Sequence, residues 1–126
     1  MMHEIIESVS KFLPLKIDVM EWNQPTLILA GKNWRFSTMS EWRVIRNNVL
    51  IYGCEDDISP EMINAIKNTE IVAVNIQSRN AVFDPAFTFS NGDQLEVFSA
   101  SYYEPWIFDF SSGIVYVASP SDPSCT

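Results

Sequence analysis

Apolar and polar residues alternate along most of the chain in short segments, which is the pattern of strands that bury one face. Residues 26–30 and 33–38 flank a Gly-Lys turn and predict a hairpin. Within this hairpin, Trp34 and Phe36 face one side and Arg35 faces the other. We therefore expect a sheet whose apolar face covers a core.

Further hairpins are predicted by turn residues between apolar segments. Residues 42–46 and 49–52 flank Asn47 and Asn48, and asparagine tolerates the positive φ of a two-residue turn. An Asn-Gly-Asp turn at 91–93 joins a strand around Phe87 to residues 95–97. Near the end of the chain, residues 106–110 and 114–118 flank a Ser-Ser-Gly turn. Residues 71–77 alternate in the same way and predict one more strand.

Residues 13–20 alternate with a period of two and predict a single half-buried strand. Leu13, Leu15, Ile17 and Val19 occupy one face of this strand, and mostly polar residues occupy the other. We therefore expect these four side chains to point into the core.

Two short helices are expected between the strands. Residues 4–11 carry apolar side chains at helical spacing, and Pro14 ends the segment. The second helix starts with the capping hydroxyl of Ser59 followed by Pro60, and it ends near residues 67–68.

Together these elements predict an α+β protein, mainly an antiparallel β-sheet with two short helices. Eight or nine short strands form a curved sheet or a sandwich, with a helix over an open edge or face. The strand order stays open. A chain of 126 residues with 47% hydrophobic residues fits one domain over residues 1–126, with residues 119–126 as a loose tail.

The chain also indicates a cytoplasmic protein. Acidic residues follow the first methionines where a signal peptide carries lysine or arginine, and no apolar segment is long enough to span a membrane. Cys54 and the penultimate Cys125 are expected to be free thiols, because a structural disulfide to a tail residue is unfavourable in a reducing compartment.

The net charge of −8 is unevenly distributed. The first 79 residues hold all eight basic residues against ten acidic ones, whereas the last 47 hold six acidic residues and no lysine or arginine. Phosphate contacts require lysine and arginine, so we expect no nucleic-acid partner. An acidic surface instead favours a basic protein partner, because complementary charge speeds association.

No catalytic motif stands out. His3 is the only histidine, and there is no phosphate-binding glycine loop and no CxxC or HExxH pattern. The acidic run at 55–57 lacks the spacing of a calcium loop and fits a solvated loop before a helix. We expect no catalytic residues, no metal and no cofactor. A paired-carboxylate glycosidase site among Asp93, Glu96, Glu104 and Asp109 remains an alternative.

A binding surface is the expectation that remains. Tyr102 and Tyr103 point to opposite faces if the chain is extended there, so one ring is exposed, although a β-bulge could pack both. Tyrosine is a frequent anchor at interfaces. We assign partner binding to one acidic and aromatic set: Asp93, Glu96, Tyr102, Tyr103, Glu104 and Asp109.

A resemblance to a known class of proteins rests on four segments of the chain. They are residues 89–98, residues 103–106, the hairpin at 113–115 and the earlier Trp34-Arg35-Phe36 strand. Over residues 25–118 the chain resembles small bacterial β-rich immunity proteins of contact-dependent growth inhibition and other polymorphic toxin systems. The Glu-Pro-Trp sequence at 104–106 and the proline-rich tail depart from that pattern.

The resemblance implies a monomer or homodimer that binds a cognate toxin in the cytosol and occludes its active site. A basic nuclease-type toxin would suit the acidic chain. Two other binding roles stay open: a non-catalytic adaptor for another cytosolic protein, or a small-ligand carrier with a pocket inside a curved sheet.

Overall fold

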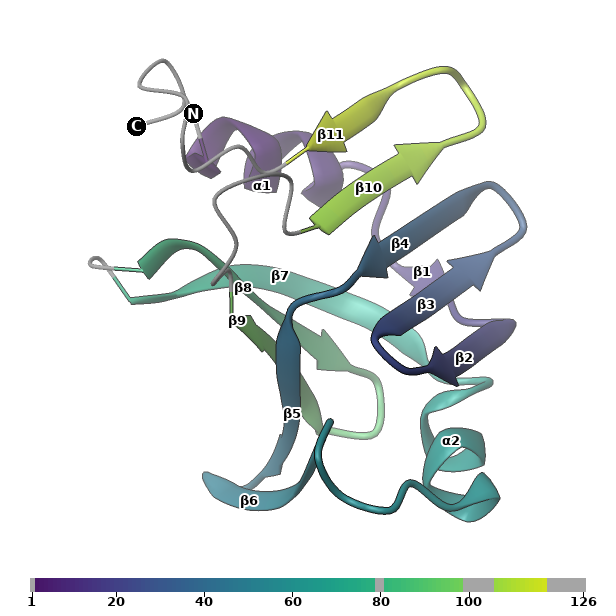
Figure 1. The fold of residues 1–126 in the computed structure, drawn as a ribbon. Coiled ribbons are helices and arrows are strands. Elements are labelled where there is room, and N and C mark those ends of the chain that lie inside the picture. The colour runs from purple at the N-terminus through teal and green to yellow at the C-terminus, as the bar shows by residue number, and fades with distance from the viewer. Residues whose placement is uncertain (1, 79–80, 99–105, 118–126) are drawn as a thin grey trace.

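The computed structural model describes residues 2–78, 81–98 and 106–117, which form two antiparallel sheets and two helices (Figure 1). Sheet A has the order β1-β7-β8-β9-β5-β6, with these bounds: β1 (Leu15–Lys16), β7 (Glu70–Ser78), β8 (Ala81–Phe89), β9 (Gln94–Phe98), β5 (Glu41–Arg46), β6 (Val49–Gly53). Sheet B has the order β11-β10-β4-β3-β2, with these bounds: β11 (Val115–Val117), β10 (Trp106–Phe110), β4 (Trp34–Thr38), β3 (Thr26–Gly31), β2 (Val19–Asn23). The predicted α+β class is confirmed, and the sheets form a sandwich that does not close into a barrel.

Aromatic side chains from both sheets meet in the core. The Phe36 ring of β4 lies 4.8 Å from the Phe87 ring of β8, centroid to centroid, and Trp22 of β2 lies 5.2 Å from Trp42 of β5. Phe108 of β10 also packs against Phe87. Because these rings come from opposite sheets, the residues that alternate with them point outward on opposite faces of the sandwich.

The local turns agree with the sequence prediction. Asn47 and Asn48 adopt φ values of 52° and 63° and join β5 to β6. Gly92 adopts a φ of 92° in the turn between β8 and β9. The side chains of Trp34 and Phe36 are buried, and Arg35 between them is exposed, as the alternation predicts.

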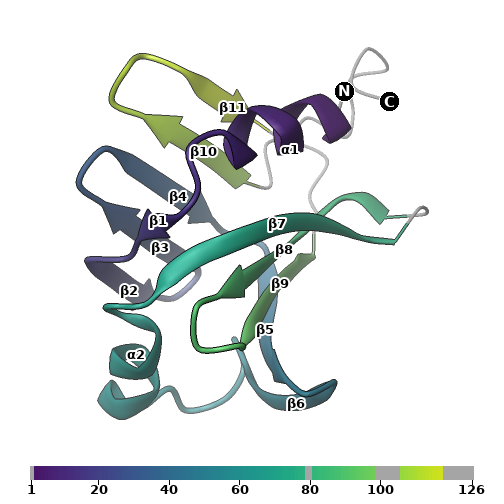
Figure 2. The ribbon, with the colours of Figure 1, turned by 180° about the vertical axis from the view of Figure 1, so that it is seen from behind.

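Both predicted helices are present, and they cover different parts of the sandwich. Helix α1 (Met2–Ser10) lies beside β7 and β10–β11 in both views and buries Val9 (Figures 1 and 2). Helix α2 (Pro60–Ile66) starts at the Ser59 cap, whose hydroxyl accepts a hydrogen bond of 3.2 Å from the Met62 amide. Ile66 anchors α2 to the core.

The prediction of one strand over residues 13–20 is wrong. Leu15 and Lys16 pair with β7 in sheet A, whereas Val19 begins β2, which pairs with β3 in sheet B. Ile17 lies at the crossing and is fully buried. After Ile17 the chain enters strand β2 of sheet B, where the even-numbered side chains face the core instead of the odd-numbered ones. Met20 and Trp22 therefore point inward, and Val19 is exposed.

This division is one reason why the described residues contain eleven strands, more than the eight or nine expected. The expected tail at 119–126, with Cys125, lies outside the described residues.

Candidate functional site

Asp93, the first residue assigned to partner binding, is a structural residue of the β8–β9 turn. It is only 3% exposed, and its two carboxylate oxygens accept hydrogen bonds from Arg46 Nε at 2.8 Å and Arg46 Nη2 at 3.0 Å. Its amide donates to Asn91 Oδ1 at 2.9 Å. The hydrogen bond to Asp93, and then the charge of that carboxylate, raise the pKa of the Arg46 guanidinium. A partner cannot reach this carboxylate, so the structure does not support Asp93 as an interface residue.

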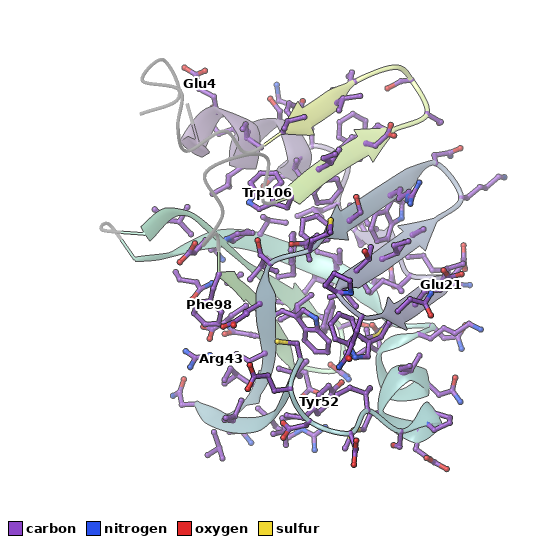
Figure 3. The ribbon with its side chains drawn as sticks, in the orientation of Figure 1. Glu4, Glu21, Arg43, Tyr52, Phe98 and Trp106 are labelled. Atoms are coloured by element: carbon purple, nitrogen blue, oxygen red, sulfur yellow. The ribbon has the colours of Figure 1, made fainter. Side chains whose placement is uncertain are left out.

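Glu96 lies on the outer face of sheet A and is also paired. Its Oε1 accepts a hydrogen bond of 2.6 Å from Arg43 Nε on the neighbouring strand β5. The same guanidinium lies over the Phe98 ring at 4.9 Å from its centroid, and the two side chains lie side by side in Figure 3. Glu96 is therefore partly neutralised by its own sheet.

Asp109 lies on the outer face of sheet B, where it is exposed opposite Arg35 of β4. The two sheets pack through their inner faces, so Glu96 and Asp109 lie on opposite sides of the molecule. The remaining assigned residues Tyr102, Tyr103 and Glu104 lie outside the described residues. Among the described residues, the assigned acids form no single patch and line no common cleft, so the fold does not assemble the paired-carboxylate site from Asp93, Glu96 and Asp109.

Strand β6 carries a surface that the sequence analysis missed. Val49, Leu50 and Ile51, here called the β6 surface, are 64%, 57% and 39% exposed. The strand is the last one of sheet A among the described residues. Ile51 is skipped in the pairing with β5, which is a β-bulge that interrupts the alternation of inward and outward side chains.

Beneath the β6 surface, Tyr52 points inward and is buried (Figure 3). Its hydroxyl donates to the Met62 carbonyl of α2 at 3.5 Å. Burial raises the pKa of the Tyr52 phenol to about 12; the Asp93 carboxylate adds to the rise and the Arg46 guanidinium opposes it. Tyr52 thus connects the strand that carries the β6 surface to the core and to α2.

An acidic loop follows β6 directly. Glu55, Asp56 and Asp57, here called the acidic loop, are all exposed. The loop is held in place because the Gly53 amide donates to Asp56 Oδ2 at 2.7 Å and the Asp56 amide donates to the Gly53 carbonyl at 3.0 Å. In Figure 1 the loop runs between β6 and α2 at the lower end of the molecule. Apolar and acidic side chains therefore lie next to each other on one end of the sandwich.

A shallow depression of about 270 Å³ connects these features to sheet A. Leu50 lines it together with Arg43 and Phe98, and Glu55 and Asp56 lie at its acidic side. The depression is an extension of the β6 surface, with apolar side chains next to carboxylates.

The sequence did carry a signal for this surface. Val49, Leu50 and Ile51 are three consecutive apolar residues in a strand, and successive side chains of a regular strand point to opposite faces. They could not all point into one core. Which of them would be exposed depends on the bulge, which has no distinct sequence mark.

No helix within the described ranges is long and apolar enough to cross a membrane. In the same residues, no three histidine, cysteine or acidic side chains are grouped as a metal site would require. Comparison with protein-family models, with curated proteins and with solved structures returned no match.

Proposed function

We propose that this protein binds another protein through the β6 surface and the acidic loop, and that the partner is a basic toxin domain neutralised in the cytosol. The observation that carries the proposal is the exposure of Val49, Leu50 and Ile51 beside three exposed carboxylates. Exposed apolar side chains bordered by charged ones are typical of protein–protein interfaces.

The charge of this surface favours a basic partner. Glu55, Asp56 and Asp57 lie at the border of the apolar side chains, where charged groups mainly raise the association rate and exclude unsuitable partners. A nuclease-type toxin has a cleft that attracts phosphate, and carboxylates placed at that cleft would compete with the substrate. Binding of this kind needs no catalytic group in the inhibitor.

One further consideration supports a toxin rather than another cytosolic partner. The chain resembles immunity proteins over residues 25–118, and those proteins act by occluding their toxin. Because Asp93 and Glu96 are bound to Arg46 and Arg43, we assign the contact surface to the β6 end rather than to these two acids. The adaptor role would use the same surface with a non-toxic partner.

The first experiment is a pull-down of the tagged protein from its native host with the neighbouring genes co-expressed. We expect one stoichiometric basic protein whose toxicity is lost in the complex. Recovery of no such partner from a folded sample, or a partner that stays toxic when bound, would contradict the toxin proposal. A stoichiometric non-toxic partner bound at the β6 surface would favour the adaptor role.

Variants then map the contact by calorimetry and stopped-flow kinetics. The double substitution Val49→Asp and Leu50→Asp should weaken binding by about 100-fold or more, because it places charge in the apolar centre of the interface. The double substitution Glu55→Lys and Asp57→Lys should lower the association rate by about tenfold at low salt.

Matched controls are available on distant elements. Val115→Asp changes an apolar side chain of similar exposure on β11, and Glu7→Lys reverses an exposed acid on α1. Both should bind as the wild type does. Single reversals of Glu96 and of Asp109 test the C-terminal surfaces separately. If the Val49→Asp and Leu50→Asp variant keeps wild-type affinity while a reversal of Glu96 or of Asp109 weakens binding, the interface does not lie at β6.

A further inference from the structure

A second concave site lies away from the β6 surface. It is a cavity of about 790 Å³, within the range of small-molecule sites. The β3–β4 and β10–β11 turns supply one side of it, and the connection from α1 to β1 supplies the other. Figures 1 and 2 both place these two turns on the same side of the molecule, away from β6.

Aromatic rings form the apolar wall of this cavity. Phe12 is partly exposed and stacks on Phe110, with ring centroids 4.2 Å apart. Trp34 also lines the cavity, and its Nε1 donates to the Lys16 carbonyl at 3.0 Å, which holds the indole against β1. A Cβ at Gly31 would lie only 2.1 Å from Trp34 Nε1, so this position requires glycine for the indole to lie there. The wall is therefore fixed before any ligand enters.

Two lysine residues border the same wall. Lys16 and Lys32 both line the cavity and are exposed. In the described part of the chain, neither forms an ion pair, whereas Arg43 and Arg46 each bind a carboxylate. Among the described residues, Asp18 is the only acidic one that lines the cavity. The cavity thus has a local excess of positive charge in a protein whose net charge is −8.

Neutral hydrogen-bonding groups complete the lining. Asn33, Ser111 and Ser112 come from the two turns, and the Ser111 amide donates to the Asn33 carbonyl at 3.0 Å, which joins the turns.

We propose that this cavity binds a small organic anion with an apolar, preferably aromatic, body. The body would lie against Phe12 and Trp34, and the anionic group would be held by Lys16 and Lys32.

The headgroup could be a carboxylate or a phosphate, and the test separates the two. The probes are 4-phenylbutyrate and phenyl phosphate, with 4-phenylbutanol as the uncharged analogue and inorganic phosphate as a headgroup without a body. Binding is followed by calorimetry and by the NMR signal of the Trp34 indole N–H. At least one of the two aromatic anions should bind with a dissociation constant near or below about 1 mM and shift that signal.

Three variants connect the binding to the residues. The double variant Lys16→Met and Lys32→Met should weaken the anion by about tenfold, since each exposed ion pair contributes modestly. Asp18→Asn should strengthen it by about threefold, because it removes the repelling carboxylate. Lys67→Met changes an exposed lysine outside the cavity and should leave binding unchanged. These positions are exposed, so the variants should keep the thermal stability of the wild type.

The outcome is decisive in either direction. Binding of an aromatic anion that falls in the lysine variant and rises in Asp18→Asn supports the site, and the stronger anion identifies the headgroup. Failure of both anions to bind, equal binding of 4-phenylbutanol, or binding that is unchanged in the lysine variant overturns it. None of these results depends on a protein partner at β6.

Discussion

Asp93 connects the β8–β9 turn to strand β5 directly and to helix α2 through Asn91. Its carboxylate binds Arg46 of β5 through two hydrogen bonds, and its backbone amide is held by Asn91, whose side chain reaches the Ala65 carbonyl of α2 at 3.4 Å. A buried carboxylate with several hydrogen bonds is expensive to disturb, since each lost bond leaves a desolvated group.

We therefore expect Asp93→Asn to lower the free energy of unfolding by about 1–3 kcal/mol, measured by chemical denaturation. The matched control is Asp109→Asn, at an exposed position on β10, which should change stability by less than about 0.5 kcal/mol. Equal effects of the two substitutions would show that the buried contacts of Asp93 contribute nothing to stability.

Tyr52 gives the protein a specific response to alkaline pH. Its folded-state pKa of about 12 lies above its ordinary value of 10.0. The folded state therefore keeps this proton where the unfolded state loses it, and the stability it contributes is complete below pH 10 and lost between pH 10 and 12.

Tyr52→Phe should reduce this loss of stability above pH 10, measured by denaturation at a series of pH values. In an absorbance titration of the phenols, the same variant should lack a step near pH 12. Tyr116→Phe is the control, and it should keep both the alkaline loss of stability and the absorbance step that Tyr52→Phe removes. An unchanged alkaline profile in Tyr52→Phe would place the origin of the pH dependence elsewhere.

At the scale of elements, Ile17 occupies the point where the chain leaves one sheet and enters the other. Its amide donates to the Thr69 carbonyl at 2.9 Å, its carbonyl accepts from the Asn68 amide at 2.8 Å, and its side chain is fully buried. The next amide, that of Asp18, donates to Ala30 of β3. The crossing is thus tied to both sheets within two residues.

Ile17→Ala should lower the free energy of unfolding by about 2–5 kcal/mol, because the core cannot collapse around a residue fixed from both sides. Ile28→Ala on β3 removes the same atoms from a half-buried position and should cost less than about 2 kcal/mol. Thermal and chemical denaturation measure both variants, and similar costs would mean that the crossing relaxes around the smaller side chain.

The same region shows how far sequence patterns reach. The hairpin around Asn47 and the capped helix after Ser59 depend on neighbours in the chain, and both were predicted from local residues. The alternation over residues 13–20 continues across Ile17 without interruption, although the backbone changes sheets there. Periodicity reports which side chains alternate, but it does not report to which sheet they belong.

At the scale of the whole molecule, the sheet order depends on contacts between distant segments. Strand β5 pairs with β9 and β4 pairs with β10, in each case across about half of the chain. No local pattern selects these pairings, which are set by the packing of the complete core. The sequence therefore predicted the class of fold, a curved sheet or sandwich with two helices, and left its strand order open.

The candidate site could be predicted from the sequence only in part, for the same reason. Acidic residues were visible in the sequence, but their roles depend on the long-range pairs that neutralise Asp93 and Glu96 and leave Glu55, Asp56 and Asp57 exposed. The cavity at Lys16 and Lys32 is assembled from elements distant in sequence, so neither lysine could be assigned to it from sequence alone.

The bulge at Ile51 has a further consequence for how this protein can change over time. An edge strand with a regular ladder invites another strand, and then its backbone determines what it binds. The bulge interrupts that ladder, so the proposed recognition at β6 would rest on the side chains of residues 49–51. Under the proposed function, single substitutions there would redirect recognition to a new toxin while leaving the fold unchanged, which an inhibitor needs when its target diversifies rapidly.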